Sequence, residues 1–133
     1  MAYRIPNQHP LDLNQRVAVG VSIPFSSPSV FNLTYTTTDQ IKSNLINYIL
    51  TNRGERVLNP NFGSNLRAQL FENIDPDTIS ALELTIISDI RRYFPMISIN
   101  SLTLTPSYEE HAIRLVLTYS VLNNVPETIQ ILL

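Results

Sequence analysis

Cysteine is absent from this sequence of 133 residues, and glycine and charged residues are scarce. Without cysteine the chain forms neither disulfides nor thiolate metal sites, and it has no cysteine nucleophile. Its three glycines are too few to suggest a glycine-rich phosphate loop. Charged residues make up only 15% of the chain, the formal net charge is −2, and no run of Lys or Arg occurs, so nucleic acid is not expected as a partner.

Long hydrophobic runs are also missing. No apolar stretch approaches the roughly 20 residues that span a bilayer, and the N-terminus lacks the basic flank and apolar run of a secretory signal, so we expect a soluble protein with no membrane partner. Apolar residues nevertheless make up 44% of the chain, enough for one core. We expect an irregular arm over residues 1–16, which shows no sustained period, and a single domain over residues 17–133.

Hydrophobic periodicity predicts both helices and strands. Alternation with a period of two predicts strands over residues 17–25, 30–35, 97–104, 111–121 and 128–133. Helical spacing predicts helices over residues 38–52 and 76–93, with a short helix after Ser64. Turns are predicted at residues 26–28 and 106–110, and a change of strand face at Asn100–Ser101. This order predicts an α+β fold in which helices pack on one face of a small antiparallel β-sheet.

The ends of the helices carry side-chain signals. Thr38, Ser64 and Asp75 are expected N-caps, because their side-chain oxygens can accept orphaned backbone N–H groups. Pro76 suits the first position of the long helix, where no N–H is needed, and Gly54 is expected to stop the first helix. The predicted apolar stripe of the long helix is Ile79, Leu82, Ile86, Ile90 and Tyr93. The last strand is expected at a sheet edge, where it can accept a strand from another chain.

Residues that could carry catalysis are few and scattered. His9 lies in the arm, His111 is expected at a strand end or partly buried, and the two belong to no ligand cluster, so neither a metal nor a cofactor is expected. A glycosidase needs two facing carboxylates. The candidates are Glu55, Glu72, Asp75, Asp77, Glu109 and Glu110. Capping, ion pairing and turn positions explain most of them, so no catalytic residue is assigned, and a peptidoglycan-degrading glycoside hydrolase is kept as the alternative function.

One loop, residues 51–66, has a distinctive set of turn-forming and charged residues for so sparsely charged a chain. It combines a glycine turn with a charged trio, Arg53, Glu55 and Arg56, followed by an Asn-Pro turn and an aromatic-glycine step. One interpretation is a well-defined interhelical loop in which the arginines pair with Glu55 or cap carbonyls of the first helix. The other is a loop that binds a partner.

The residues of this loop resemble the signature of a known family. The signature residues are Arg53, Gly54, Glu55, Arg56, Pro60, Phe62 and Gly63. They are similar to those of the contractile-tail baseplate wedge proteins, also called sheath initiators, and the similarity extends from about Val17 to the C-terminus. The resemblance implies a non-enzymatic structural protein of the virion, located in the tail baseplate and assembled in the host cytoplasm.

The resemblance also implies partners. These are the helical core bundle formed by other baseplate wedge proteins and the tail sheath protein, with several copies of the chain around the tail axis. The sheet would template the first sheath ring by strand addition. The implied partner-binding residues are Phe94, Pro95 and Met96 after the long helix, and Arg114, Val116 and Thr118 on a strand.

One departure from the family pattern concerns the segment after the long helix. The family often carries Glu-Pro-Arg there, as a motif that docks on the core bundle, whereas this chain has Phe94, Pro95 and Met96. Apolar packing would have to replace a charge-assisted contact, with Phe94 as an aromatic anchor. Alternatively, Phe94 and Met96 are core residues and docking lies elsewhere. A small binding module unrelated to tails is a further alternative for the whole chain.

Overall fold

The computed structural model describes residues 9–14, 16–23, 32–72 and 75–133. The chain falls into two units, Met1–Asn47 and Tyr48–Leu133, and the boundary lies inside a helix. Helices and antiparallel sheets are both present, which confirms the predicted α+β class. None of the described helices combines the length and the apolar character needed to cross a membrane.

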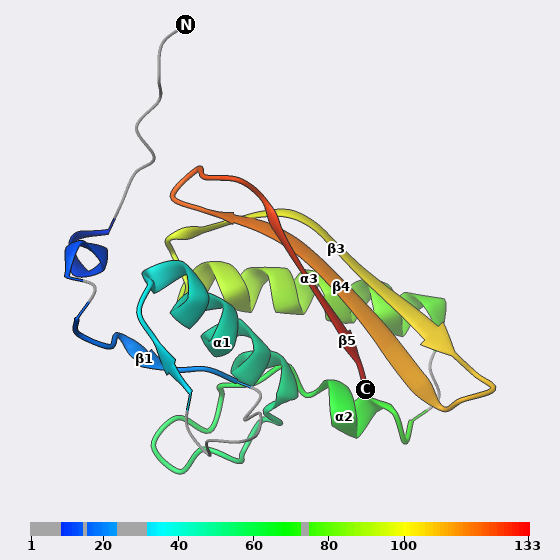
Figure 1. Ribbon diagram of the computed structural model, residues 1–133. Helices are drawn as coiled ribbons and strands as arrows, with labels where there is room; N and C mark the ends of the chain where they lie inside the picture. The colour runs from blue at the N-terminus through cyan, green and yellow to red at the C-terminus, as the bar shows by residue number, and fades with distance from the viewer. Residues whose placement is uncertain (1–8, 15, 24–31, 73–74) are drawn as a thin grey trace, which may run out of the picture. The chain divides into compact units, whose positions relative to one another are not determined.

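The first unit contains a short 3-10 helix, a two-stranded sheet and most of the helix α1. The 3-10 helix spans Pro10–Leu13, β1 spans Gly20–Val21, β2 spans Leu33–Thr34, and α1 spans Thr37–Leu50 (Figure 1). β1 and β2 pair in antiparallel orientation. The predicted strands 17–25 and 30–35 are therefore reduced to two residues each within the described ranges, because only this short stretch forms a ladder. Residues 24–31, which include the predicted turn, lie outside those ranges.

Helix α1 begins one residue earlier than predicted, and its cap is Thr36 instead of Thr38. The Thr36 hydroxyl accepts the N–H of Asp39 at 3.2 Å and donates to the Asp39 carboxylate at 2.7 Å. Asp12 adds a second cap, because its carboxylate accepts from both the N–H and the hydroxyl of Thr37 at 2.7 Å. Three consecutive threonines could each cap this helix, and the contacts with Asp12 and Asp39 determine which of them is the N-cap.

The second unit contains two helices and a three-stranded antiparallel sheet. Helix α2 spans Leu66–Gln69, α3 spans Pro76–Tyr93, β3 spans Ile97–Ser107, β4 spans Ala112–Val121, and β5 spans Glu127–Leu132. The strand order is β3-β4-β5, so β5 lies at an edge as predicted (Figure 1). α3 has the predicted bounds, with Pro76 at its start, but the Asp75 side chain makes no capping bond. The N-cap position of α2 is Asn65, whose side chain makes no capping bond, whereas the predicted Ser64 lies one residue earlier and its hydroxyl accepts the N–H of Leu66 at 3.3 Å.

Strand β3 is longer than predicted, because it continues through Pro106 to Ser107. The turn that follows is displaced to residues 108–111, and His111, with φ of 48°, lies in this turn instead of in the strand. The register shifts between Ile99 and Ser101, which confirms the predicted change of face. A bulge of this kind lets a long edge strand keep its apolar side chains on the core side.

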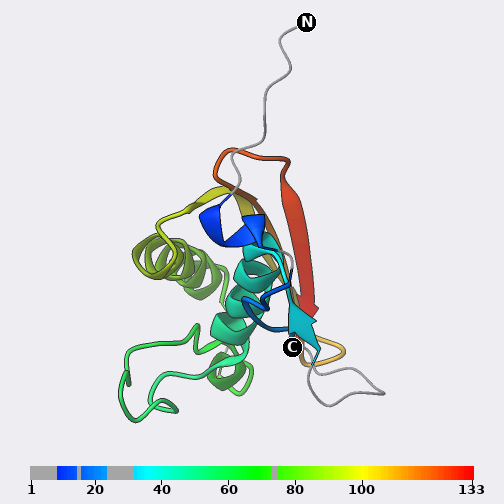
Figure 2. The ribbon, with the colours of Figure 1, turned by 60° about the vertical axis from the view of Figure 1, so that its left-hand side comes forward.

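The two faces of the three-stranded sheet differ in character. The buried residues of β4 include Ile113, Leu115, Leu117 and Tyr119. Helix α3 lies along this sheet and buries Ile86 and Ile90 from the predicted stripe (Figures 1 and 2). The residues of opposite parity present mainly hydroxyl and amide groups, and they include Ser101, Thr103, Thr105, Thr118, Thr128 and Gln130. One face is therefore core, and the other is polar.

Candidate functional site

The signature loop is closed by its own backbone. The N–H of Gly54 donates to the Pro60 carbonyl at 2.7 Å, and the N–H of Phe62 donates to Asn59 at 3.1 Å. The Asn52 amide donates to the Glu55 carboxylate at 3.0 Å. These bonds join the two sides of the loop at its base and hold the intervening residues in one turn.

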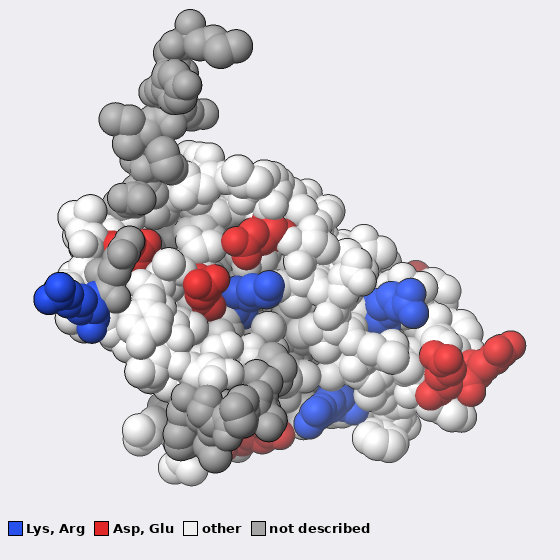
Figure 3. All heavy atoms as spheres, viewed as in Figure 1, with Lys and Arg blue, Asp and Glu red and all other residues white. Residues whose placement is uncertain are grey.

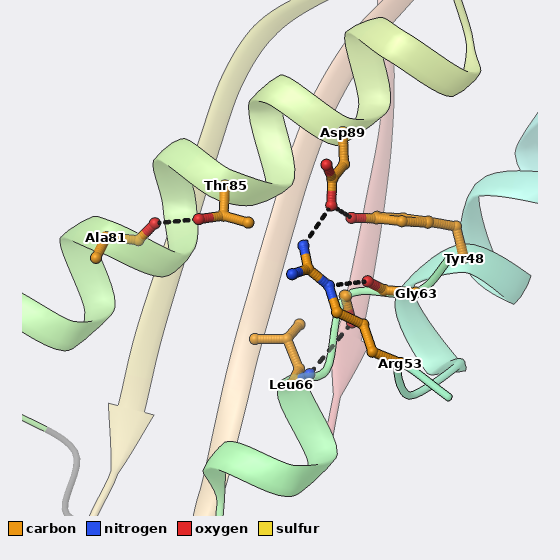
Figure 4. Close-up of polar contacts among 8 residues, drawn as sticks. Tyr48, Arg53, Gly63, Leu66, Ala81, Thr85 and Asp89 are labelled. Carbon is orange, nitrogen blue, oxygen red and sulfur yellow. Dashed lines mark hydrogen bonds and ion pairs between the residues drawn. The ribbon is translucent and has the colours of Figure 1, made fainter. Parts of the chain in front are cut away.

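Arg53 ties the loop to helix α3 (Figure 4). Its guanidinium forms an ion pair with Asp89 at 2.9 Å, and its Nε–H donates to the Gly63 carbonyl at 3.5 Å. Asp89 also accepts the hydroxyl of Tyr48 at 3.0 Å. Burial, reinforced by the Asp89 charge, raises the pKa of Tyr48 well above its usual range, so the phenol stays protonated and remains a donor.

Phe62 packs the far side of the loop into an aromatic cluster. Its buried ring lies edge-on to Tyr48 and Tyr93, with centroid distances of 5.3 and 5.2 Å. The guanidinium carbon of Arg56 lies 3.9 Å from the centroid of Phe62, which is a cation–π distance. Arg56 therefore covers a buried ring from the solvent side.

Both signature glycines hold backbone conformations that favour glycine. The φ angles are 90° at Gly54 and 128° at Gly63. A Cβ atom at Gly63 would lie 2.5 Å from the Thr51 carbonyl oxygen, whereas a Cβ at Gly54 would meet nothing within 4 Å. Glycine is therefore required at position 63, both because φ is positive and because a Cβ atom would have no space there.

The loop is well defined, as one sequence interpretation expected, but its ion pair is a different one. Arg53 pairs with Asp89 instead of Glu55, and the Glu55 carboxylate accepts a hydrogen bond from the Asn52 amide. Sequence reasoning missed Asp89 and Tyr48 as partners of the loop. Asp89 lies one position before the stripe residue Ile90, so a carboxylate at the border of the apolar face was the available signal.

The segment after α3 is partly packed and partly exposed. Phe94 is half-buried, and its ring lies 6.4 Å from that of Tyr48, edge-on. Its N–H donates to the Ile90 carbonyl at 2.8 Å and ends the helix. Pro95 is exposed and Met96 is 41% exposed. Within this segment Phe94 is therefore packed against the aromatic cluster, whereas Pro95 and Met96 are accessible to a partner.

Arg114, Val116 and Thr118 lie on the polar side of β4. Arg114 is exposed, and the other two are half-buried. β4 is the central strand, paired with β3 on one side and β5 on the other. These residues can therefore meet a partner through their side chains, but their backbone cannot accept an added strand. Strand addition requires one of the two edges.

The β3 edge is protected from strand addition at two points. The N–H of Leu104 points away from β4 and donates to the Glu83 carboxylate of α3 at 2.9 Å. Pro106, two residues further along, has the same outward orientation and no N–H to offer. A covering side chain and a proline are two devices that protect a sheet edge from further pairing.

The β5 edge has a different construction. Leu133 and Ile113 exchange two backbone hydrogen bonds of 3.0 Å. Alternation along the antiparallel ladder then directs the N–H and C=O groups of Thr128, Gln130 and Leu132 away from β4. This row has the spacing that an incoming strand requires.

The carboxylates do not form an enclosed catalytic pair. Glu72 and Asp75 line a cavity of about 660 Å³ together with Tyr108 and His111. Both carboxylate residues are exposed, whereas the general acid of a glycosidase lies against apolar surface. Within the described ranges no three His, Asp or Glu residues gather in a way that could hold a metal ion.

Together these features define a small α+β protein with a braced loop and a strand edge oriented for pairing. The family model described as baseplate wedge protein gp25 matches residues 36–125. The baseplate wedge protein gp25 of Enterobacteria phage T4 is 36% identical over 91 residues, which cover 68% of this chain and 69% of that relative. The chain therefore belongs to the gp25 family of baseplate wedge proteins, which confirms the family that the sequence resembles.

Two solved structures share the fold. A crystal structure of a proposed tail lysozyme from Geobacter sulfurreducens superposes with a TM-score of 0.63 and 22% identity, covering 74% of this chain and 90% of that one. The cryo-EM structure of the anti-feeding prophage baseplate gives a TM-score of 0.61 and 22% identity, covering 78% and 85%. At this level of identity the likeness shows the fold alone.

Proposed function

We propose that this chain is a non-enzymatic structural subunit of a contractile tail baseplate that starts the sheath by strand addition to β5. The proposal rests on membership of the gp25 family. In it, other wedge proteins form the helical bundle on which the chain docks, several copies surround the tail axis, and assembly takes place in the host cytoplasm.

The contrast between the two edges of the sheet carries this proposal. The β3 edge is covered by Glu83 and interrupted by Pro106, while β5 directs the backbone groups of Gln130 and its alternate neighbours outward. A strand from the sheath protein would gain main-chain hydrogen bonds along β5, which need no charge. Repetition of such contacts around a ring raises the effective concentration of each one.

Docking on the wedge bundle is proposed for the segment after α3. Pro95 and Met96 are exposed, and Phe94 braces them from the aromatic cluster. A thioether next to a proline adapts to an apolar helix surface without requiring a charged partner. The polar side chains around Val116 and Thr118 are proposed as a second, lateral contact with the sheath.

Replacing Gln130 by proline tests strand addition directly. Because the N–H of this exposed residue points away from β4, Gln130→Pro removes a donor from the outer side of β5 and leaves the ladder to β4 in place. We expect the variant to fold and to enter baseplates, and electron microscopy of tails should then show tubes without sheath.

The matched variant Gln130→Ala keeps the main-chain donor and should allow sheath addition. Circular dichroism and thermal unfolding check that both variants retain the fold. Tails with a normal sheath built on Gln130→Pro would refute pairing at β5. Loss of sheath in both variants would instead assign the contact to the side chain and would also contradict the proposal.

A further inference from the structure

The signature loop ends in two aliphatic side chains that stand in solvent. Val57 is 94% exposed and Leu58 is 100% exposed, and they are adjacent in the chain. We propose that Val57 and Leu58 form an anchor that inserts into an apolar pocket on a neighbouring protein of the baseplate, with a carboxylate of that neighbour beside Arg56. This contact is separate from the β5 edge and from the segment after α3.

The first argument is that the surrounding residues hold this tip in place. The bond from Gly54 to Pro60 closes the loop immediately around it. Arg53 fixes one side of the loop to Asp89, and Phe62 fixes the other side in the aromatic cluster. An anchor that is already ordered loses little conformational entropy on binding, which is the main advantage of preorganisation.

The second argument is that the exposed aliphatic pair has no role in the fold of its own unit. Most polar and aromatic residues around it make contacts with the body of the unit, whereas Val57 and Leu58 are almost completely accessible. Single exposed apolar residues are ordinary on protein surfaces, but two neighbouring ones on a braced loop form a patch that water leaves when a partner binds.

The third argument concerns the charge beside the tip. The guanidinium of Arg53 is committed to Asp89. The guanidinium carbon of Arg56 instead lies 3.9 Å from the centroid of the Phe62 ring, and the residue is exposed, so its N–H donors are accessible to a partner. A guanidinium with accessible donors suits a bidentate carboxylate. The partner surface therefore combines an apolar pocket with Asp or Glu at its rim.

A protein is favoured over a lipid surface as the occupant. Glu55 lies next to Arg56, so the tip carries charges of both signs and would gain little from an anionic headgroup layer. Two aliphatic side chains also bury too little area for stable membrane attachment, which takes a larger apolar face or a second signal.

The test uses the full chain with serine at both positions, Val57→Ser with Leu58→Ser, expressed in cells that make all the other tail proteins. The number of copies per purified tail is measured by quantitative immunoblot. We expect at least about a tenfold loss of incorporation, as for the truncation of a central anchor, with an unchanged melting temperature because neither side chain is buried. Arg56→Glu should also reduce incorporation, whereas Val57→Ile with Leu58→Met should preserve it.

Val125→Ser is the matched control, because Val125 is 83% exposed in the connection between β4 and β5. This control should be incorporated normally. Normal incorporation of the double serine variant, or an equal loss in the control, would overturn the proposal. Sedimentation of the wild-type chain with phosphatidylcholine–phosphatidylglycerol vesicles, lost in the double variant, would assign the tip to membrane and overturn it as well.

This experiment is independent of the proposed strand addition. The double serine variant is expected to be missing from the baseplate, whereas Gln130→Pro is expected to be present there without sheath above it. A photo-crosslinker placed at position 58 in assembled tails should join the chain to a baseplate protein through an apolar peptide. Crosslinking only to the sheath protein would contradict the assignment to a baseplate neighbour.

Discussion

At the scale of single residues, the loop that carries the family resemblance in this chain is in large part a set of structural requirements. Arg53 binds Asp89, Phe62 fills the space beside Tyr48, and Gly63 permits close approach of the backbone to Thr51. These residues shape the loop and hold it against the rest of the second unit. A motif can therefore identify a family because of what it holds in place.

The two signature glycines allow a matched prediction. Gly63→Ala places a Cβ against a backbone carbonyl and also strains φ, so we expect about 3 kcal/mol of destabilisation. Gly54→Ala strains φ alone, with open space around the new Cβ, and should cost about 1 kcal/mol. Urea unfolding of the full chain measures both values. Equal losses of unfolding free energy in the two variants would show that the contact with the Thr51 carbonyl adds nothing to the destabilisation.

At the scale of elements, each edge of the sheet and each end of a helix has a distinct role. Helix α3 contributes Glu83 to the β3 edge, Asp89 to the loop and Phe94 to its own C-terminus. One helix thus protects one sheet edge and braces the loop that carries the exposed tip. Covering β3 leaves β5 as the edge whose geometry suits an added strand.

The segment after α3 can be tested by separating its exposed residue from its packed one. Met96→Asp should leave the melting temperature unchanged, because the side chain is 41% exposed. It should nevertheless weaken docking on purified wedge complexes at least about tenfold, as expected for a charge introduced into an apolar contact. Phe94→Ala removes a ring that contacts Tyr48 and should cost about 1–2 kcal/mol of stability. Docking is measured by analytical ultracentrifugation.

Normal docking of Met96→Asp would exclude this segment as the contact. If Phe94→Ala lowered stability and left docking of the folded protein unchanged, Phe94 would be a core residue only. Reduced docking in both variants, with a stable fold, would support an anchor formed by the whole segment.

At the scale of the whole molecule, the sparse charge has a structural counterpart. On the face seen in Figure 3, Lys, Arg, Asp and Glu form small separate groups, and most of the surface is uncharged. The open face of the three-stranded sheet presents mainly Ser, Thr and Gln. Such surfaces can pair with other proteins without the cost of burying ions, which suits a subunit enclosed by neighbours.

The non-enzymatic proposal predicts the absence of cell-wall hydrolysis. Purified protein should not reduce the turbidity of a peptidoglycan suspension below that of a buffer control, because Glu72 and Asp75 are both exposed, unlike the general acid of a glycosidase. Clearing that disappears in Glu72→Gln but persists in Glu109→Gln would instead establish the glycoside hydrolase alternative.

Much of the second unit could be predicted from local signals. The apolar stripe from Ile79 to Tyr93, followed by Pro95, predicts the bounds of α3, and alternation around Leu115 predicts β4. The first unit was less predictable, because its predicted strands reach only two residues each and Thr36, not Thr38, caps α1. Alternation and capping propensity are local, whereas ladder length and cap choice depend on distant partners such as Asp12.

The sequence by itself determined the α+β class, the long helix, the central strand, the edge position of β5 and, through the spacing of its loop residues, the family. The tertiary structure alone decided that Arg53 pairs with Asp89 and that Glu83 and Pro106 protect the β3 edge from further pairing. It also decided that Val57 and Leu58 are exposed. The physical reason is the distance along the chain over which each kind of interaction acts. Periodicity and turn chemistry act over a few residues, but ion pairs, edge protection and exposure depend on which segments meet after folding.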